Sequence, residues 1–276
     1  KPGDEILIAR NCHKAVYNAC FLNRLQVHYV EAEFDPTTGF YTRVTQAALD
    51  EALAAHPEVV AVVVTSPTYE GYISRLHCSV PLVVDAAHGA HLGLAPWLPG
   101  RMEGDAVICS YHKTLPALTQ TAGVQVYDSS LAPKIKRYMD MYETSSPSYV
   151  LMNSVAKMAD LVADPAAFET LQAGLLKLYK LPLEHLRLIQ ADDPTKINIS
   201  TLHCNIDGNA LAHRLRACGI EPEMSDRIHV ICMATVGDTA AGFDLLARAL
   251  REIDCTLEPG DWPVAPLPLP PRHLQS

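Results

Sequence analysis

Two kinds of residue follow one another in the stretch Ala106-Val107-Ile108-Cys109-Ser110-Tyr111-His112-Lys113: a short apolar run, then four side chains that can ionise or form hydrogen bonds. The earlier stretch Leu82-Val83-Val84-Asp85-Ala86-Ala87-His88 has the same order, and Asp85 precedes Lys113 by 28 positions. Short runs rich in Val and Ile are typical of strands buried on both faces. We therefore expect each stretch to form a buried strand that presents polar residues at its carboxyl end.

Strand and helix patterns alternate through the first half of the chain. Further apolar runs lie at residues 6–9, 27–31, 59–65 and 124–127. Residues 14–25 and 46–55 are helix candidates, and Thr45 can cap the second of them. This alternation predicts an α/β fold with a mostly parallel sheet flanked by helices. In such sheets ligands bind at the carboxyl ends of the strands, where the polar residues described above lie.

The pattern changes after residue 130. Residues 131–190 are mostly helical, and Ser148 can cap a helix over 149–162. Strands and helices are then expected in the order 197–203, 209–218, 229–234 and 239–253. We predict a large domain over 1–190 and a small α+β domain over 191–258. Six prolines between Pro259 and Pro271 predict an extended proline-rich tail over 259–276.

The composition excludes several classes of protein. The 276 residues carry a net charge of −9 without a basic block, which argues against a nucleic-acid partner. The longest apolar runs are shorter than the roughly 18 residues that a membrane helix needs. Eight scattered cysteines without a CxxC motif are typical of reduced core residues in a cytoplasmic protein. The chain opens on Lys1-Pro2-Gly3-Asp4, a turn before a strand, and we expect a longer protein upstream.

Lys113 and Asp85 together favour one chemistry. A lysine presented at a strand end can form a Schiff base with pyridoxal phosphate, and Ser110 and His112 beside it can donate hydrogen bonds to a phosphate. An aspartate can keep the cofactor's ring nitrogen protonated, so that electrons from the substrate's alpha carbon flow into the ring. Taken alone, a Ser-x-His-Lys stretch is more often a plain polar loop. Because Asp85 accompanies this stretch, we favour a pyridoxal-phosphate site over a plain polar loop.

Five motifs in order along the chain carry a resemblance to a known family. They are Arg10-Asn11-Cys12-His13-Lys14, Thr65-Ser66-Pro67-Thr68-Tyr69-Glu70-Gly71, Asp85-Ala86-Ala87-His88-Gly89-Ala90-His91, Ser110-Tyr111-His112-Lys113-Thr114-Leu115 and Thr144-Ser145-Ser146-Pro147-Ser148-Tyr149. Together they resemble the ornithine/lysine/arginine decarboxylases, which belong to the aminotransferase-like, fold type I group of pyridoxal-phosphate enzymes. The resemblance runs from residue 1 to about 269. Relative to that family we expect the chain to be truncated at both ends.

The resemblance implies a role for each motif residue. Lys113 would hold the cofactor as a Schiff base, Asp85 would pair with its ring nitrogen, and His88 would cover the ring or protonate the substrate's alpha carbon. The other implied cofactor contacts are His13 and Ala87 on the two ring faces, Ser110 and His112 at the phosphate, and Thr65 and Ser66 at the ring's edge. A helix cap or a buried structural residue is the alternative for His13. Residues 144–148 would reach a neighbouring subunit's cofactor.

A metal site is not predicted. His88 and His91 have the i, i+3 spacing of a ligand pair, but no third ligand with suitable spacing accompanies them.

By resemblance, the expected function is pyridoxal-phosphate-dependent decarboxylation of arginine, lysine or ornithine, a reaction of polyamine metabolism, in a homodimer or larger even assembly. Glu70, Glu143 and Glu223 are candidates to meet a distal cationic group of the substrate. An aminotransferase or an aldolase of the same fold is the alternative enzyme, and Arg137 or Arg227 could then bind a substrate carboxylate. A non-catalytic relative that serves dimerisation or regulation is the second alternative.

The sequence also departs from the family. By this resemblance we expect the family's upstream phosphate-binding loop and C-terminal domain to lie outside the 276 residues. Residues 70–80 are too few for the helix that usually joins parallel neighbours, which predicts a deletion.

Overall fold

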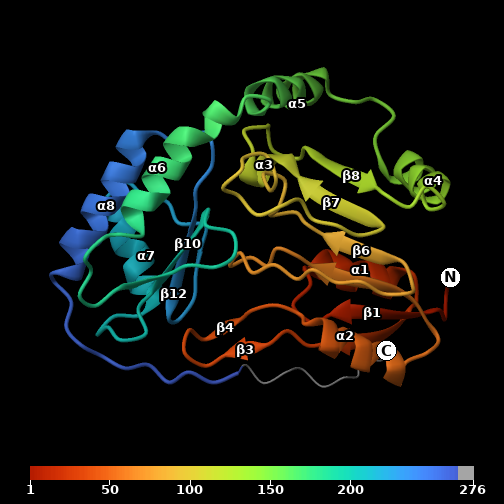
Figure 1. Ribbon diagram of the computed structural model, residues 1–276, viewed down its shortest axis with the longest axis horizontal. Coiled ribbons are helices and arrows are strands. Elements are labelled where there is room, and N and C mark those ends of the chain that lie inside the picture. The colour runs from red at the N-terminus through yellow and green to blue at the C-terminus, as the bar shows by residue number, and fades with distance from the viewer. Residues whose placement is uncertain (267–276) are drawn as a thin grey trace.

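A six-stranded sheet forms one lobe of the computed structural model, which describes residues 1–266 (Figure 1). The spatial order is β2-β1-β5-β6-β7-β8, and all neighbours are parallel except β7 and β8. The strands are β1 (Glu5–Ala9), β2 (Gln26–Val30), β5 (Val59–Thr65), β6 (Leu82–Asp85), β7 (Ala106–Ser110) and β8 (Ala122–Val126). The predicted α/β class and mostly parallel sheet are confirmed, and each of the six predicted runs forms one strand.

Two helices accompany the first strands. Helix α1 (Lys14–Leu22) ends earlier than residue 25 because Arg24 adopts a positive φ of 55° in the turn that follows. Helix α2 (Gln46–Ala55) has the predicted bounds, and the Thr45 hydroxyl accepts a hydrogen bond from the Ala48 amide as its N-cap. The short hairpin of β3 (Phe34–Asp35) and β4 (Phe40–Tyr41) lies between them and was not predicted.

The connection between β5 and β6 contains no helix, although these strands are parallel neighbours. Ile73 and Leu76 of this connection are buried in the hydrophobic cluster that also contains strand residues such as Val62 and Val84. The segment therefore covers the sheet with irregular backbone where a crossover helix is usual. The predicted deletion in this connection stays a prediction.

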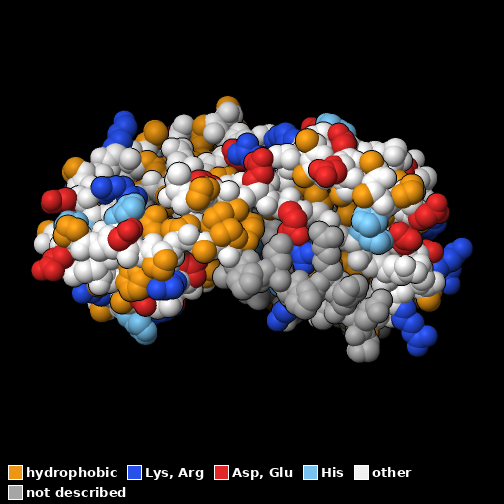
Figure 2. All heavy atoms as spheres, turned by 90° about the horizontal axis from the view of Figure 1, so that it is seen from below, with side chains coloured by type: hydrophobic (Ala, Val, Ile, Leu, Met, Phe, Trp, Pro, Cys, Tyr) orange, Lys and Arg blue, Asp and Glu red, His pale blue; other side chains and the backbone are white. Residues whose placement is uncertain are grey.

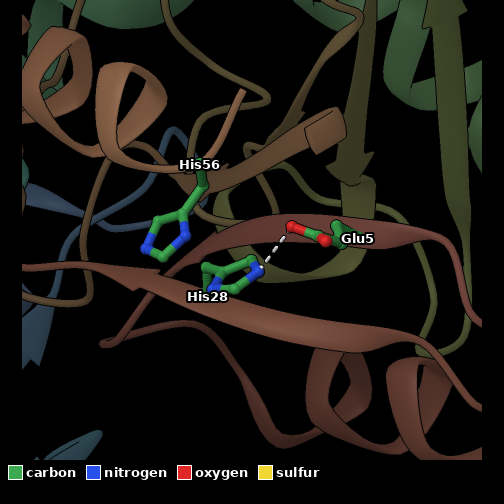
Figure 3. Close-up of side chains that lie close together, drawn as sticks. All are labelled: Glu5, His28 and His56. Carbon is green, nitrogen blue, oxygen red and sulfur yellow. Dashed lines mark hydrogen bonds and ion pairs between the residues drawn. The ribbon is translucent and has the colours of Figure 1, made fainter. Parts of the chain in front are cut away.

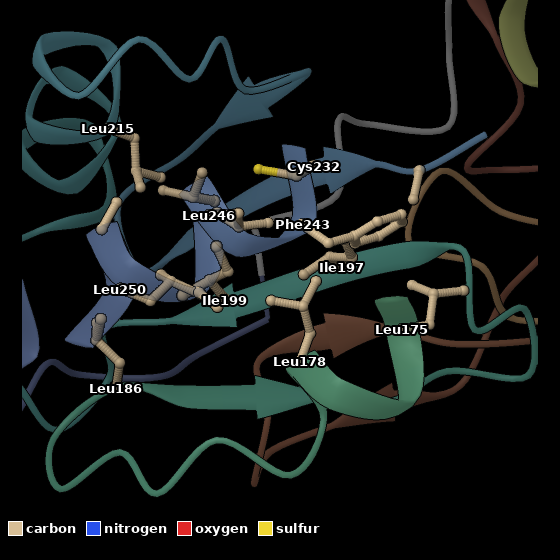
Figure 4. Close-up of a cluster of buried hydrophobic side chains, with 14 of the residues drawn as sticks. Leu175, Leu178, Leu186, Ile197, Ile199, Leu215, Cys232, Phe243, Leu246 and Leu250 are labelled. Carbon is tan, nitrogen blue, oxygen red and sulfur yellow. The ribbon is translucent and has the colours of Figure 1, made fainter. Parts of the chain in front are cut away.

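A second, antiparallel sheet forms the other lobe, in the order β11-β12-β10-β9. Its strands are β9 (Arg187–Ile189), β10 (Lys196–Ser200), β11 (Met224–Ser225) and β12 (His229–Met233). Helices α6 (Glu169–Leu178), α7 (Gly208–Ala217) and α8 (Ala240–Asp254) pack with this sheet, and the 3₁₀ helix η1 (Pro165–Phe168) precedes α6. Leu178, Ile197 and Phe243 show how α6, β10 and α8 share one core (Figure 4).

The two lobes are in contact. Ala95 and Leu98, from the segment between β6 and β7, belong to the same hydrophobic cluster as the core of the second sheet. Strand β9 and helix α6 of that lobe precede residue 191, and the domain boundary at 190 stays a prediction. Of the predicted tail, residues 267–276 lie outside the described residues.

Helices α4 (Ala132–Tyr142) and α5 (Tyr149–Val162) run along the outside of the molecule, at the top of Figure 1. Helix α5 has the predicted bounds, and the Ser148 hydroxyl accepts from the Leu151 amide. Large apolar side chains of both helices are exposed, among them Tyr142 and Tyr149 at 84% and 81%.

Charged side chains of both signs are interspersed on the face shown in Figure 2. Every helix within residues 1–266 is too short or too polar to cross a lipid bilayer. All eight cysteines have free thiols.

Candidate active site

The carboxyl ends of β5, β6 and β7 lie side by side. Thr65 is the register partner of Asp85, and Asp85 is the partner of Ile108 in the next strand. The loops that leave these ends also approach closely, since a Cβ at Gly89 would come within 2.8 Å of Pro67 Cδ. The topology therefore brings residues from three separate motifs to one edge of the sheet, where α/β folds bind ligands.

Lys113 lies on the short helix α3 (Tyr111–Thr114), which follows β7 directly and was not predicted. Its Nζ is 3.2 Å from His88 Nε2, so the structure brings these two predicted residues together. His112 Nδ1 donates to the Thr121 carbonyl at 2.8 Å, which fixes the orientation of its ring. Ser110 is the N-cap of α3 but makes no side-chain capping bond.

Asp85 ends strand β6 and is half-buried. One carboxylate oxygen, Oδ1, accepts a hydrogen bond from the Ala87 amide at 3.1 Å, which holds the carboxylate against the turn that follows. Ala87 is itself half-buried. Because this bond uses Oδ1, the other carboxylate oxygen can accept a hydrogen bond from an N–H group of a ligand.

Thr65 and Ser66, the two residues predicted at the ring's edge, differ in their hydrogen bonds. Ser66 is completely buried, and its hydroxyl both donates to the Ser74 carbonyl at 3.0 Å and accepts from the Ser74 amide at 2.9 Å. Ser66 thus holds the β5–β6 connection together. The Thr65 Oγ1 atom is buried beside the Cys12 thiol but makes no hydrogen bond of ordinary geometry. An unpaired buried hydroxyl is costly, and a bound ligand would relieve that cost.

His13 is exposed at the start of α1, after the carboxyl end of β1. Its Nδ1 accepts a hydrogen bond from the Ala15 amide at 3.2 Å, so His13 is a helix cap, as the alternative interpretation proposed. A cap can also stack on a cofactor, and that role stays a prediction.

Lys196, the first residue of β10, is a site residue that was not predicted. Its side chain is completely buried, and its Nζ lies 3.1 Å from His88 Nδ1, on the other side of the ring from Lys113. Gly71, with a φ of +98°, makes room for it, because a Cβ there would come within 2.8 Å of Lys196 Cγ. Burial lowers the pKa of Lys196 to about 8, although Asp193 and Glu223 favour its charged form. The sequence did carry a signal for it: a lysine opens an apolar strand. Lysine is rarely buried without partners, so a lysine at such a position is a candidate site residue.

His88 therefore lies between two lysines. Burial, together with Lys196 and Lys113, lowers its pKa to about 2, so the ring is neutral at pH 7. A neutral imidazole has one N–H donor and one bare nitrogen. If both contacts are hydrogen bonds, one lysine donates to the bare nitrogen and the other accepts the N–H as an unprotonated amine. That amine is the form that attacks an aldehyde.

A polar cluster of His91, Asp193 and Thr195 lies near His88. His91 Nε2 is 3.2 Å from both Asp193 Oδ1 and Thr195 Oγ1, and the Thr195 hydroxyl donates to Asp193 at 2.7 Å. His91 thus bonds within this cluster, and His88 contacts the two lysines. Burial by itself would raise the pKa of Asp193, but His91, Lys196 and Thr195 outweigh it and lower that pKa to about 2.

Asp193→Asn should make the protein less sensitive to acid. The pKa of Asp193 falls from 3.8 to about 2 on folding, so its contribution to stability is present above pH 4 and lost as the pH falls toward 2. This contribution is about 2 kcal/mol. Urea unfolding at pH 7 and pH 3 should show a smaller loss of stability for the variant than for the wild type. Equal losses in both proteins would contradict the lowered pKa.

Two of the three predicted acidic residues lie near Lys196 and His88. The Tyr69 ring is tilted against the His88 ring with 4.5 Å between their centroids, and the Tyr69 hydroxyl donates to Glu223. The charges of Glu223 and Glu70 both act on Lys196. Burial raises the pKa of Glu70. Glu143 is exposed at the C-cap of α4.

Comparison with known proteins identifies the family. Residues 1–176 match the family model described as the Orn/Lys/Arg decarboxylase major domain. The chain belongs to the Orn/Lys/Arg decarboxylase family. It is 32% identical over 281 residues to an arginine decarboxylase of Halalkalibacterium halodurans, covering 91% of this chain and 57% of that protein. The chain spans 57% to 64% of the length of the curated relatives that it matches.

Solved structures support the fold. The constitutive lysine decarboxylase of E. coli superposes with a TM-score of 0.72 at 20% identity, over 92% of this chain and 46% of that one. Alanine–glyoxylate aminotransferase of Nostoc sp. superposes with a TM-score of 0.66 at 15% identity, over 92% of this chain and 76% of that one. The predicted aminotransferase-like fold is therefore confirmed, while the roles of the individual site residues stay predictions.

Proposed function

We propose that the chain catalyses pyridoxal-phosphate-dependent removal of the alpha carboxylate from arginine, lysine or ornithine, yielding the corresponding amine and CO₂. The observation that carries this proposal is the meeting of Lys113 and His88 at the sheet edge where Asp85 ends β6. Membership of the decarboxylase family supports the reaction type. The roles of the residues and the choice of substrate are parts of the proposal.

The residues at this edge fit pyridoxal phosphate. Lys113 would hold it covalently, and the Asp85 oxygen not bonded to Ala87 would accept a hydrogen bond from its protonated ring nitrogen. The buried Thr65 hydroxyl, which lies beside the Cys12 thiol without a hydrogen bond of ordinary geometry, would find a partner at the ring's edge. The bound cofactor supplies an electron sink for the pair of electrons released with CO₂. Ser110 and His112 would contact its phosphate, and His13 and Ala87 would lie against its two faces.

His88 would move protons at Lys113 Nζ. Its Nε2 is within hydrogen-bond distance of that atom, and its Nδ1 contacts Lys196, so a proton taken at one ring nitrogen can be released at the other. Lys113 or His88 is the candidate donor to the substrate's alpha carbon.

A basic substrate would place its distal cation near Glu223 and Glu70. We expect Glu223→Gln to raise the KM for the preferred substrate on the order of 10-fold with a smaller change in kcat, because a charge-assisted hydrogen bond contributes about 1.5–3 kcal/mol. Steady-state CO₂ release measures both constants. Glu103→Gln, at another exposed acidic position, is the matched control. Equal KM values for both variants and the wild type would remove Glu223 from the substrate site.

We further propose a cytoplasmic homodimer or larger even assembly. The apolar side chains exposed on α4 and α5 flank residues 144–148, the segment that by resemblance reaches a neighbouring subunit. Burial of such side chains favours association. Light scattering after size-exclusion chromatography should give twice the chain mass or more, and a monomer at micromolar concentration would contradict the assembly.

Release of labelled CO₂ from carboxyl-labelled arginine, lysine and ornithine, with pyridoxal phosphate added, tests the function. We expect release from at least one of the three. Conversion of the cofactor to its amine form without CO₂ would instead indicate transamination. Neither product, with cofactor bound, would indicate a non-catalytic relative.

A further inference from the structure

Three potential metal ligands converge at the opposite end of the large sheet from Asp85. Glu5 is the first residue of β1, His28 lies on the edge strand β2, and His56 is the C-cap of α2 (Figure 3). One ligand atom from each lies within 4.8 Å of the other two. Within residues 1–266 this is the one group of three or more His, Cys, Asp or Glu side chains that meets that criterion.

The fold itself places these side chains together. Glu5 pairs with Gln26 and Leu7 pairs with His28, so Glu5 and His28 project from the same face of adjacent parallel strands. His28 Nε2 lies 2.8 Å from Glu5 Oε2. The His56 ring stacks on the His28 ring with 3.6 Å between centroids. The His56 backbone is held in turn, since its amide donates to the Ala52 and Leu53 carbonyls.

The group has access to solvent. His28 and His56 line a surface hollow of about 1330 Å³ between α1, β2 and α2. The side chains of His28 and Glu5 are 23% and 27% exposed, so both are reached by solvent. An ion bound there would have room for water as a further ligand.

We infer that Glu5, His28 and His56 bind a divalent transition-metal ion of the Zn²⁺ type. Two imidazoles and one carboxylate are a donor set that Zn²⁺ accepts, at roughly 2.0–2.2 Å, with a water in the fourth position. Tetrahedral bonds of that length separate ligand atoms by roughly 3.3 Å. The three atoms already lie within 4.8 Å of one another, and turning the His56 ring out of its stack on His28 points a nitrogen of each ring at a shared ion. The ion replaces the hydrogen bond between His28 and Glu5 and links the edge strand β2 to β1 and α2.

Zinc titration of the chelator-treated full chain, without pyridoxal phosphate, tests the site. We expect one equivalent of Zn²⁺ to bind by calorimetry and to raise the melting temperature, since an ion that binds the folded state stabilises it. His56→Ala and the conservative Glu5→Gln should each weaken this binding at least 10-fold. His213→Ala, an exposed histidine on α7, is the matched control and should bind as the wild type does. Circular dichroism checks that each variant is folded.

A second measurement separates this site from the free thiols. X-ray absorption of the zinc-loaded wild type should show nitrogen and oxygen ligands with two imidazoles. Sulfur in the first coordination shell would assign the ion to cysteines such as the exposed Cys255 and overturn the inference. Affinities for Glu5→Gln and His56→Ala within twofold of the wild type would overturn it as well.

Discussion

Lys113→Ala should lower the rate of CO₂ release from the preferred basic amino acid on the order of 10⁴-fold or more, the size of effect seen when a covalent catalytic residue is removed. The alanine has no amine to hold the cofactor, and His88 loses its partner at Nε2. Lys196 does not replace it, because Lys196 lies at the other nitrogen of the same ring and is completely buried. Steady-state release of labelled CO₂ measures the effect.

Lys134→Ala is the control for this experiment. Lys134 is an exposed lysine on α4, so its removal should leave the rate within about twofold of the wild type, as surface changes usually do. Full activity of Lys113→Ala would place the reactive amine elsewhere. Full activity combined with an inactive Lys196→Met variant would assign that role to the buried lysine.

Asp85→Asn should lower kcat by roughly 10²- to 10⁴-fold, the range typical of a lost proton-holding group. Asparagine has nearly the same shape, and its carbonyl oxygen can still accept the Ala87 amide, so the turn after β6 is kept. The amide carries no negative charge to hold a proton on the cofactor's ring nitrogen, which weakens the electron sink. We expect kcat to fall much more than KM changes, because the proposed role of Asp85 is a contact with the cofactor and not with the substrate.

Asp50→Asn is the matched control, an exposed carboxylate on α2 that accepts a hydrogen bond from Gln46, as asparagine also can. An Asp85→Asn variant with wild-type kcat would show that Asp85 serves only the turn to Ala87.

The sequence predicted most of the large sheet because its signals are local. The run of β5 and the Thr45 cap of α2 lie within a few residues of the structure they specify, and both elements have the predicted bounds. The strand-end rule likewise predicted that residues 85–88 and 110–113 would lie at one edge of the sheet, where Lys113 and His88 are in contact. Helix α3 is a single turn of four residues, too short for a periodic pattern to be seen.

The contacts that the sequence did not reveal are long-range. Lys196 reaches His88 from the second sheet, 108 positions away along the chain, and only the packing of the two lobes brings them together. Glu5, His28 and His56 show no short motif, because strand register and a helix end place them. The hydrogen bond of His13 to the Ala15 amide, by contrast, is local, and the sequence offered this helix cap as the alternative for His13.

Borohydride reduction of the chain in the presence of pyridoxal phosphate, followed by peptide mass spectrometry, tests directly whether Lys113 holds the cofactor. Reduction makes any lysine–cofactor bond permanent, so the modified residue can be read from the peptides. We expect the cofactor's mass on Lys113 at one equivalent per chain, and no stoichiometric labelling of any lysine in Lys113→Ala. Cofactor found on Lys196 or spread over surface lysines, with Lys113 unmodified, would contradict it.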